Sequence, residues 1–184
     1  MRIQFFDVDE VILRFGEGFI AFVNSELKTS FNIKTHTNYN LETSFQFPPG
    51  EFDRLFNEYI SSSRIGDLEY YDDAVEYFNR TPDVVKIILT ALPKTDVTEK
   101  ERTRNLHKIK YHELIFDHKK SDYVEAYRPE LIFEDRAENV EQYLTKRKYF
   151  GKICVPRRTY IHDFEMRMRH DPQIVFYDEM TELL

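Results

Sequence analysis

The sequence predicts an α/β fold in which a parallel sheet has helices on both faces and a small helical cap is inserted after strand 1. Two observations favour this class. Short apolar runs alternate with helical patterns over residues 84–184, which is typical of βαβ units. Residues 15–77 instead repeat apolar side chains at helical spacing and contain no convincing strand. We therefore expect residues 1–14 and 78–184 to form the core, and residues 15–77 to form the cap.

The first strand is predicted at Ile3–Phe6, an apolar and aromatic run that ends at a charged residue. A strand this short cannot stand alone, so we assign it to the same sheet as the later strands. The cap follows it as an insertion, and its natural place is as a lid over one end of the sheet. Within the cap, apolar residues recur at helical spacing in segments 19–27, 52–60 and 71–78.

The core resumes with Val84–Leu89, a β-branched run typical of a buried parallel strand. Thr98–Tyr111 is predicted as a polar, basic helix, with Thr98 and Glu101 as its capping box. The remaining elements are expected to be strands at 114–116, 131–133 and 152–155, and helices at 121–127, 137–144 and 178–184.

Composition narrows the protein class. The chain has 184 residues, a net charge of −7 and one cysteine, Cys154, so an intrachain disulfide is impossible and a reducing cytoplasm is the simplest setting. No segment is apolar enough for a secretory signal or a membrane span. The acidic balance disfavours nucleic acid as a partner. We interpret the basic segment 145–169 as a solvated face.

Carboxylates follow two of the predicted strands. Asp7 and Asp9 follow the first strand, and Glu134 and Asp135 follow the strand at 131–133. Ligands of open α/β sheets bind beyond the carboxyl ends of the strands, so these side chains should meet at one edge. Four converging carboxylates would repel one another unless a cation relieved them, and oxygen ligands select a hard cation such as Mg²⁺. Glu134 and Asp135 are also expected to cap the helix that follows them.

The Asp-x-Asp spacing has a chemical logic. In an extended segment Asp7 and Asp9 point the same way, so one carboxylate can attack as a nucleophile while the other transfers protons. Thr90, after the strand at 84–89, and Lys119 or Lys120, after the strand at 114–116, would add a hydroxyl and a positive charge. Phosphoryl transfer needs this positioning and charge neutralisation.

These residues resemble the four motifs of the haloacid dehalogenase superfamily of phosphohydrolases, in order and over essentially the whole chain. The family's fold is Rossmann-like, with a cap after the first motif. The matching segments are Phe5–Val11, Ile87–Thr90, Lys120 within His118–Ser121 (with Lys119 as the alternative), and Leu131–Arg136.

The resemblance implies a role for each site residue. Asp7 would form an aspartyl-phosphate and bind Mg²⁺, while Asp9 would move protons and offer its backbone carbonyl to the metal. Asp135 would bind Mg²⁺ directly and Glu134 through water. The second motif-I aspartate favours a phosphatase over a dehalogenase. The residues implied to hold the phosphoryl group are Thr90, Ala91 and Lys120.

Further segments are similar to the 5′(3′)-deoxyribonucleotidase branch, among them Tyr39–Leu41, Thr90–Lys94 and Glu134–Asn139. This implies a small phosphorylated substrate, such as a (deoxy)nucleoside monophosphate. Most cap aromatics are expected to be cap core. Those that could stack on a base are Phe15, Phe19, Tyr39 and Phe45.

Two residues depart from the branch pattern, and two other functions remain open. Glu10 stands where the branch usually has Gly, and Glu134 replaces the first Asp of the usual acidic pair. One alternative function is a phosphatase acting on nucleic-acid ends, permitted by the basic segment 145–169. The other is a non-catalytic or phospho-signalling module on the same fold, although the motif order here disfavours a receiver domain.

Overall fold

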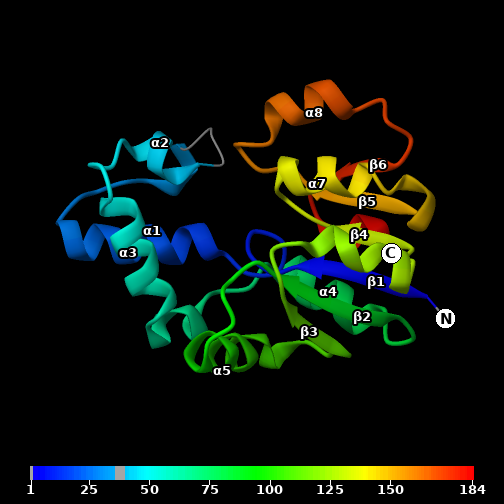
Figure 1. Ribbon diagram of the computed structural model, residues 1–184, viewed down its shortest axis with the longest axis horizontal. Helices are drawn as coiled ribbons and strands as arrows, with labels where there is room; N and C mark the ends of the chain where they lie inside the picture. Colours follow the sequence, from blue (N-terminus) through cyan, green and yellow to red (C-terminus); the bar gives the residue numbers. More distant parts are fainter. Residues whose placement is uncertain (1, 36–39) are drawn as a thin grey trace.

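The computed structural model describes residues 2–35 and 40–184 of the chain. Within them, six strands form one parallel sheet in the order β3-β2-β1-β4-β5-β6 (Figure 1). The sequence prediction of an α/β fold with a parallel sheet is confirmed. The strands are β1 (Ile3–Asp7), β2 (Val85–Thr90), β3 (Glu113–Phe116), β4 (Leu131–Phe133), β5 (Lys152–Pro156) and β6 (Ile174–Tyr177).

Strand β1 lies inside the sheet, between β2 and β4. Its successive side chains point to opposite faces, as in any strand. Phe6 stacks on Phe133 of β4 with ring centroids 4.5 Å apart, and Phe78 packs against it at the same centroid distance. Phe5 belongs to the buried cluster on the other face, together with Val140. Both faces of the sheet are therefore buried, which explains why the strands are almost continuously apolar.

Helices cover both faces, as the sequence predicts. Helix α4 (Asp72–Arg80) supplies Phe78 to the Phe6 face. The Phe5 face is covered by helices that contribute Val124, Val140 and Phe164 to its buried cluster. These helices are α6 (Val124–Tyr127), α7 (Ala137–Leu144) and α8 (His162–Met168).

Three helices of the predicted cap lie to one side of the sheet (Figure 1). They are held together by aromatic rings, and Phe19 is fully buried among them, with Phe52 and Phe56 within 6 Å of its centroid. Helix α4 belongs to the predicted cap up to residue 77, yet Tyr77 and Phe78 both pack on β1. The division into core and cap itself stays a prediction. The three helices are α1 (Phe15–Leu27), α2 (Leu41–Phe45) and α3 (Glu51–Ile60).

Two backbone segments join these helices to the sheet, and they run side by side. Leu13, in the segment before α1, pairs with Tyr70, in the segment before α4. Backbone hydrogen bonds flank this pair, from Arg14 N to the Glu69 carbonyl (2.9 Å) and from Tyr71 N to the Ile12 carbonyl (3.0 Å).

Two sequence predictions about local structure are wrong. The helix α5 (Asp96–Asn105) begins after Thr95, whose side chain forms the capping box with Thr98, so the box starts three residues earlier than predicted. The predicted helix 178–184 is only a 3₁₀ turn at Met180–Leu183, preceded by the unpredicted strand β6.

The predicted cap of α7 is wrong as well. Its N-cap residue is Arg136, and no side chain caps the helix. Glu134 instead accepts hydrogen bonds from the Arg136 backbone N–H (3.2 Å) and the Asn139 side chain (3.1 Å).

None of the helices in the described ranges is both long and apolar enough to cross a bilayer. Cys154 is buried in β5 and carries a free thiol.

Candidate active site

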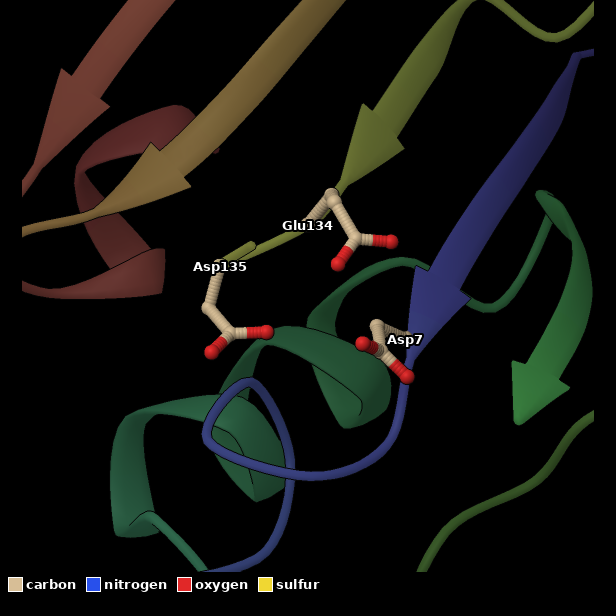
Figure 2. Close-up of side chains that lie close together, drawn as sticks. All are labelled: Asp7, Glu134 and Asp135. Atoms are coloured by element: carbon tan, nitrogen blue, oxygen red, sulfur yellow. The ribbon is translucent and has the colours of Figure 1, made fainter. Parts of the chain in front are cut away.

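Three carboxylates meet at the carboxyl end of the sheet (Figure 2). Asp7 is the last residue of β1, and Glu134 and Asp135 follow β4, the neighbouring strand. One oxygen atom from each lies within 4.8 Å of the others. The sequence reasoning that strand ends would deliver these side chains to one edge is therefore matched by the geometry.

Lys120 lies between two of these carboxylates. Its Nζ is 2.7 Å from Asp7 Oδ2 and 3.1 Å from Glu134 Oε2. The Lys120 side chain is only 3% exposed, whereas the neighbouring Lys119 is exposed. Of the two lysines considered from the sequence, Lys120 is the one that contacts the acidic cluster.

The acidic cluster carries more negative charge than Lys120 neutralises. Burial and the nearby Asp7 carboxylate raise the pKa of Glu134 to about 7. Burial, Asp7 and Glu134 also raise the pKa of Asp135 well above its ordinary value. Burial alone would lower the pKa of Lys120, but Asp7 and Glu134 outweigh it and raise that pKa.

The donor set of this cluster fits a hard divalent cation. Three carboxylates supply only oxygen atoms, and their repulsion is the kind that a bound cation relieves. Neighbouring groups also hold two of the three carboxylates in place. Tyr160 donates a hydrogen bond to Asp135 Oδ2 (2.6 Å), and the Val8 backbone N–H donates to Asp7 Oδ1 (2.6 Å). Such second-layer partners are typical of metal sites.

The two predicted phosphate contacts on β2 and just after it, Thr90 and Ala91, differ in burial. Thr90 is fully buried at the end of β2, where its Oγ1 lies 3.4 Å from the Leu92 backbone N. Ala91 follows it and is exposed. Both stay predicted contacts of the phosphoryl group.

Asp9 lies outside the three-carboxylate cluster and has its own cationic partner. Arg102 Nη2 is 2.8 Å from Asp9 Oδ1 and 3.0 Å from Oδ2. Burial raises the pKa of Asp9 to about 6, although Arg102 opposes the shift. No sequence pattern distinguishes Arg102, because a basic residue within a polar helix carries no signal of its partner.

Glu10, the departure from the branch pattern, has a structural role. Its backbone has φ = 60°, in the left-handed region that favours glycine. Its carboxylate accepts hydrogen bonds from the Gly16 backbone N–H (2.6 Å) and the Tyr71 hydroxyl (2.7 Å). Its carbonyl accepts two more from Arg158, at 3.1 and 2.8 Å. Glu10 thus connects the loop after β1 to the first turn of α1 and to the segment before α4.

A cavity of about 430 Å³ opens beside the acidic cluster. It is bounded on one side by Asp9 and Asp135 and on the other by rings from α1 and α3. This volume is in the range of small-molecule sites. The residues that line it are Asp9, Glu10, Phe15, Gly16, Ile33, Asn40, Leu41, Glu42, Phe52, Asp53, Phe56, Asp135, Arg136, Glu138 and Tyr160.

The aromatic candidates for base stacking differ in position. Phe15 lines the cavity, whereas Phe19 is fully buried in the cap core. Phe45 packs against Phe31 with centroids 5.0 Å apart. Tyr39 lies outside the described residues. Phe52 and Phe56 line the cavity too, although their helical spacing in the sequence predicts only the buried face of a helix.

Four of the eight cations in the basic segment 145–169 form ion pairs with acids. Another cation, Arg158, donates hydrogen bonds to the Glu10 carbonyl. The pairs are Lys146 with Asp122, Arg147 with Asp171, Arg157 with Glu165 and Asp178, and Arg167 with Glu141.

Comparison with known proteins identifies the family. Residues 1–174 match the model of the family described as 5′ nucleotidase, deoxy (pyrimidine), cytosolic type C protein. The chain belongs to this family. The resemblance to the nucleotidase branch that the sequence indicates is therefore confirmed, and the chain is a phosphatase. None of the curated proteins is similar enough to the chain to count as a match.

Solved structures of similar fold include a HAD family hydrolase from Deinococcus radiodurans R1 with bound phosphate and sodium. It has a TM-score of 0.59 and 12% identity, covering 96% of this chain and 91% of that one. A haloacid dehalogenase-like hydrolase from Burkholderia xenovorans LB400 has a TM-score of 0.59 and 13% identity, covering 98% and 96%. The HAD-hydrolase YfnB of Bacillus subtilis, bound to magnesium, has a TM-score of 0.57 and 17% identity, covering 99% and 96%. These likenesses confirm the fold.

Proposed function

We propose that this phosphatase is a magnesium-dependent phosphomonoesterase that acts through an aspartyl-phosphate on Asp7. The observation that carries the proposal is the buried cluster of Asp7, Glu134 and Asp135 around Lys120 at the end of the sheet. Asp7, Asp135 and, through water, Glu134 would hold Mg²⁺, together with the backbone carbonyl of Asp9. The bound cation would neutralise charge on the transferring phosphoryl group.

The protein groups divide the chemistry between them. An oxygen of Asp7 attacks phosphorus, and the bond from phosphorus to the leaving oxygen breaks as Asp9 protonates that oxygen. Asp9 then takes a proton from water, which attacks the phosphoryl group and releases it from Asp7. Lys120, Thr90 and Ala91 are proposed to hold the phosphoryl oxygens. This scheme agrees with the raised pKa of Asp9, since a general acid needs its proton near neutral pH.

We propose a nucleoside monophosphate, in its deoxy form, as the substrate class. The family's printed name supports a nucleotide, and the cavity offers the rings of Phe15, Phe52 and Phe56 to a flat base. Its volume of about 430 Å³ suits a small molecule. The family name and the single buried thiol of Cys154 also support a cytoplasmic setting.

The test is phosphate release by purified protein from p-nitrophenyl phosphate and from deoxynucleoside monophosphates, with Mg²⁺ or with a chelator. We expect Mg²⁺-dependent release, and Asp7→Asn should reduce it at least about a thousandfold because the nucleophile is lost. Asp83→Asn, an exposed change at the far end of β2, is the matched control and should leave the rate unchanged. Undiminished activity of Asp7→Asn would contradict the proposal.

A further inference from the structure

Helix α5 contains one arginine whose side chain is completely buried. Arg102 is 0% exposed, and its Nη2 lies within 3.0 Å of both carboxylate oxygens of Asp9. The two residues are separated by 93 positions in the sequence. Arg102 is therefore the side chain that holds Asp9 from the interior of the protein.

The ion pair between Asp9 and Arg102 is a costly way to stabilise the fold. The Nε and Nη1 atoms of Arg102 have no hydrogen-bond partner among the described residues. Burying a guanidinium with two unpartnered nitrogens is costly, and buried ion pairs are often no more stabilising than apolar replacements. A residue kept at such a cost points to a use other than stability.

The Asp9 side chain lies between the cavity and the protein interior. Its side chain is 26% exposed and lines the cavity beside Asp135, while Arg102 contacts it from the buried side. Helix α5 that carries Arg102 starts a few residues after Thr90, and the Thr95–Thr98 capping box fixes its start. Arg102 is thus placed by the same loop that follows the predicted phosphate contact.

We propose that Arg102 is a positioning residue that holds the Asp9 carboxyl group facing the cavity, where it protonates the leaving oxygen. The inference rests on the proposed function. In the step, the proton moves from Asp9 to the leaving oxygen as the bond to phosphorus breaks, and Arg102 keeps all of its own protons. Replacing Arg102 keeps the Asp9 carboxyl group but leaves it free to adopt other rotamers.

The test compares two leaving groups. A deoxynucleoside monophosphate releases an alkoxide, which needs a proton, whereas p-nitrophenyl phosphate releases a phenolate that leaves without one. General-acid catalysis contributes typically 10²–10⁴-fold, so Arg102→Met should lower kcat on the nucleotide by about a hundredfold. The loss on p-nitrophenyl phosphate should stay below about threefold, with KM nearly unchanged for both. Arg102→Lys should restore part of the nucleotide rate.

Controls separate positioning from folding. Lys100→Met removes an exposed cation from the same helix and should change neither rate. In an Asp9→Asn background, adding Arg102→Met should cause no further loss, because the group it positions is gone. This double variant also avoids leaving the Asp9 carboxylate without its cationic partner. If Arg102→Met does not fold, Arg102→Lys gives the same leaving-group comparison.

The outcomes are distinct. Equal losses on both substrates, or a further loss in the Asp9→Asn background, would overturn the positioning role while leaving the phosphatase assignment intact. A wild-type protein that releases phosphate from neither substrate would overturn the proposed function and the inference together.

Discussion

Asp7 and Asp9 are two residues apart, yet they belong to different parts of the molecule. Asp7 ends a strand, and its partner Lys120 also comes from the carboxyl end of the sheet. Asp9 is in the loop that leads to the cap, and its partner Arg102 comes from α5. The adjoining Glu10 contacts the first turn of α1 and the segment before α4.

The difference teaches how one short loop serves two purposes. The Asp7 side concentrates negative charge around a single cation, which suits metal and phosphate binding. The Asp9 side provides one carboxylate with a raised pKa and a fixed orientation, which suits proton transfer. Three predictions test whether these two sides act separately.

Lys120→Met should have the largest effect. It removes the cation that contacts both Asp7 and Glu134, so kcat/KM should fall by about 10²–10³-fold, as when an electrostatic stabiliser of a transition state is lost. Steady-state kinetics with Mg²⁺ would measure this on p-nitrophenyl phosphate. Lys119→Met, at the exposed neighbour, is the control and should retain full activity. If Lys119→Met were the damaging change, the assignment of Lys120 would be wrong.

The stability of the metal-free protein should depend on pH through the acidic cluster of Asp7, Glu134 and Asp135. Folding raises the pKa of Glu134 from 4.5 to about 7, so the folded state binds more protons than the unfolded chain in this window. The free energy of unfolding should then fall as pH rises from about 5 to about 8, lowering Tm by several degrees. Thermal unfolding in a chelator would measure the fall.

Two further measurements sharpen that prediction. Mg²⁺ should reduce the fall in Tm, because it stabilises the ionised cluster, and Glu134→Gln should flatten the metal-free profile. A Tm that rises across this pH range without Mg²⁺ would show that the acidic cluster does not set the pH dependence of stability.

Glu10→Ala should have the smallest effect, on the cap side. It removes the acceptor of the Gly16 N–H and the Tyr71 hydroxyl but keeps a side chain at φ = 60°. The expected loss is about 1–3 kcal/mol of unfolding free energy, measured by urea denaturation. Glu10→Gly loses the same contacts but relieves the backbone, so it should be less destabilised. Equal values for the two variants would mean that the left-handed backbone carries no cost here.

Sequence reasoning succeeded where the signal was local. A β-branched or aromatic run followed directly by a carboxylate or hydroxyl marks a strand end, so Asp7, Thr90 and Glu134 could be assigned to one edge of the sheet. Lys120 could not be separated from Lys119 in this way, because the choice depends on which side chain points inward. The roles of these residues stay proposals.

Sequence reasoning failed where a feature depends on residues that are far apart in the sequence. Arg102 meets Asp9 across 93 positions and Tyr71 meets Glu10 across 61, and no spacing rule links such residues. Strand β6 is a different kind of miss, since Ile174–Tyr177 is a β-branched and aromatic run whose strand signal is local. The capping box was misplaced because Thr95 and Thr98 are both plausible caps by residue type.

The place of β1 in the sheet has a consequence for how the chain folds. This strand precedes all the others in the sequence, yet both of its neighbours come much later, with β2 starting at Val85 and β4 at Leu131. Pairings across such long separations are slow to form, because loop closure must precede the contacts that reward it. During synthesis, Phe5 and Phe6 cannot pair with β2 until residue 88 has emerged, nor with β4 until residue 133 has emerged, so this apolar strand stays exposed on the nascent chain.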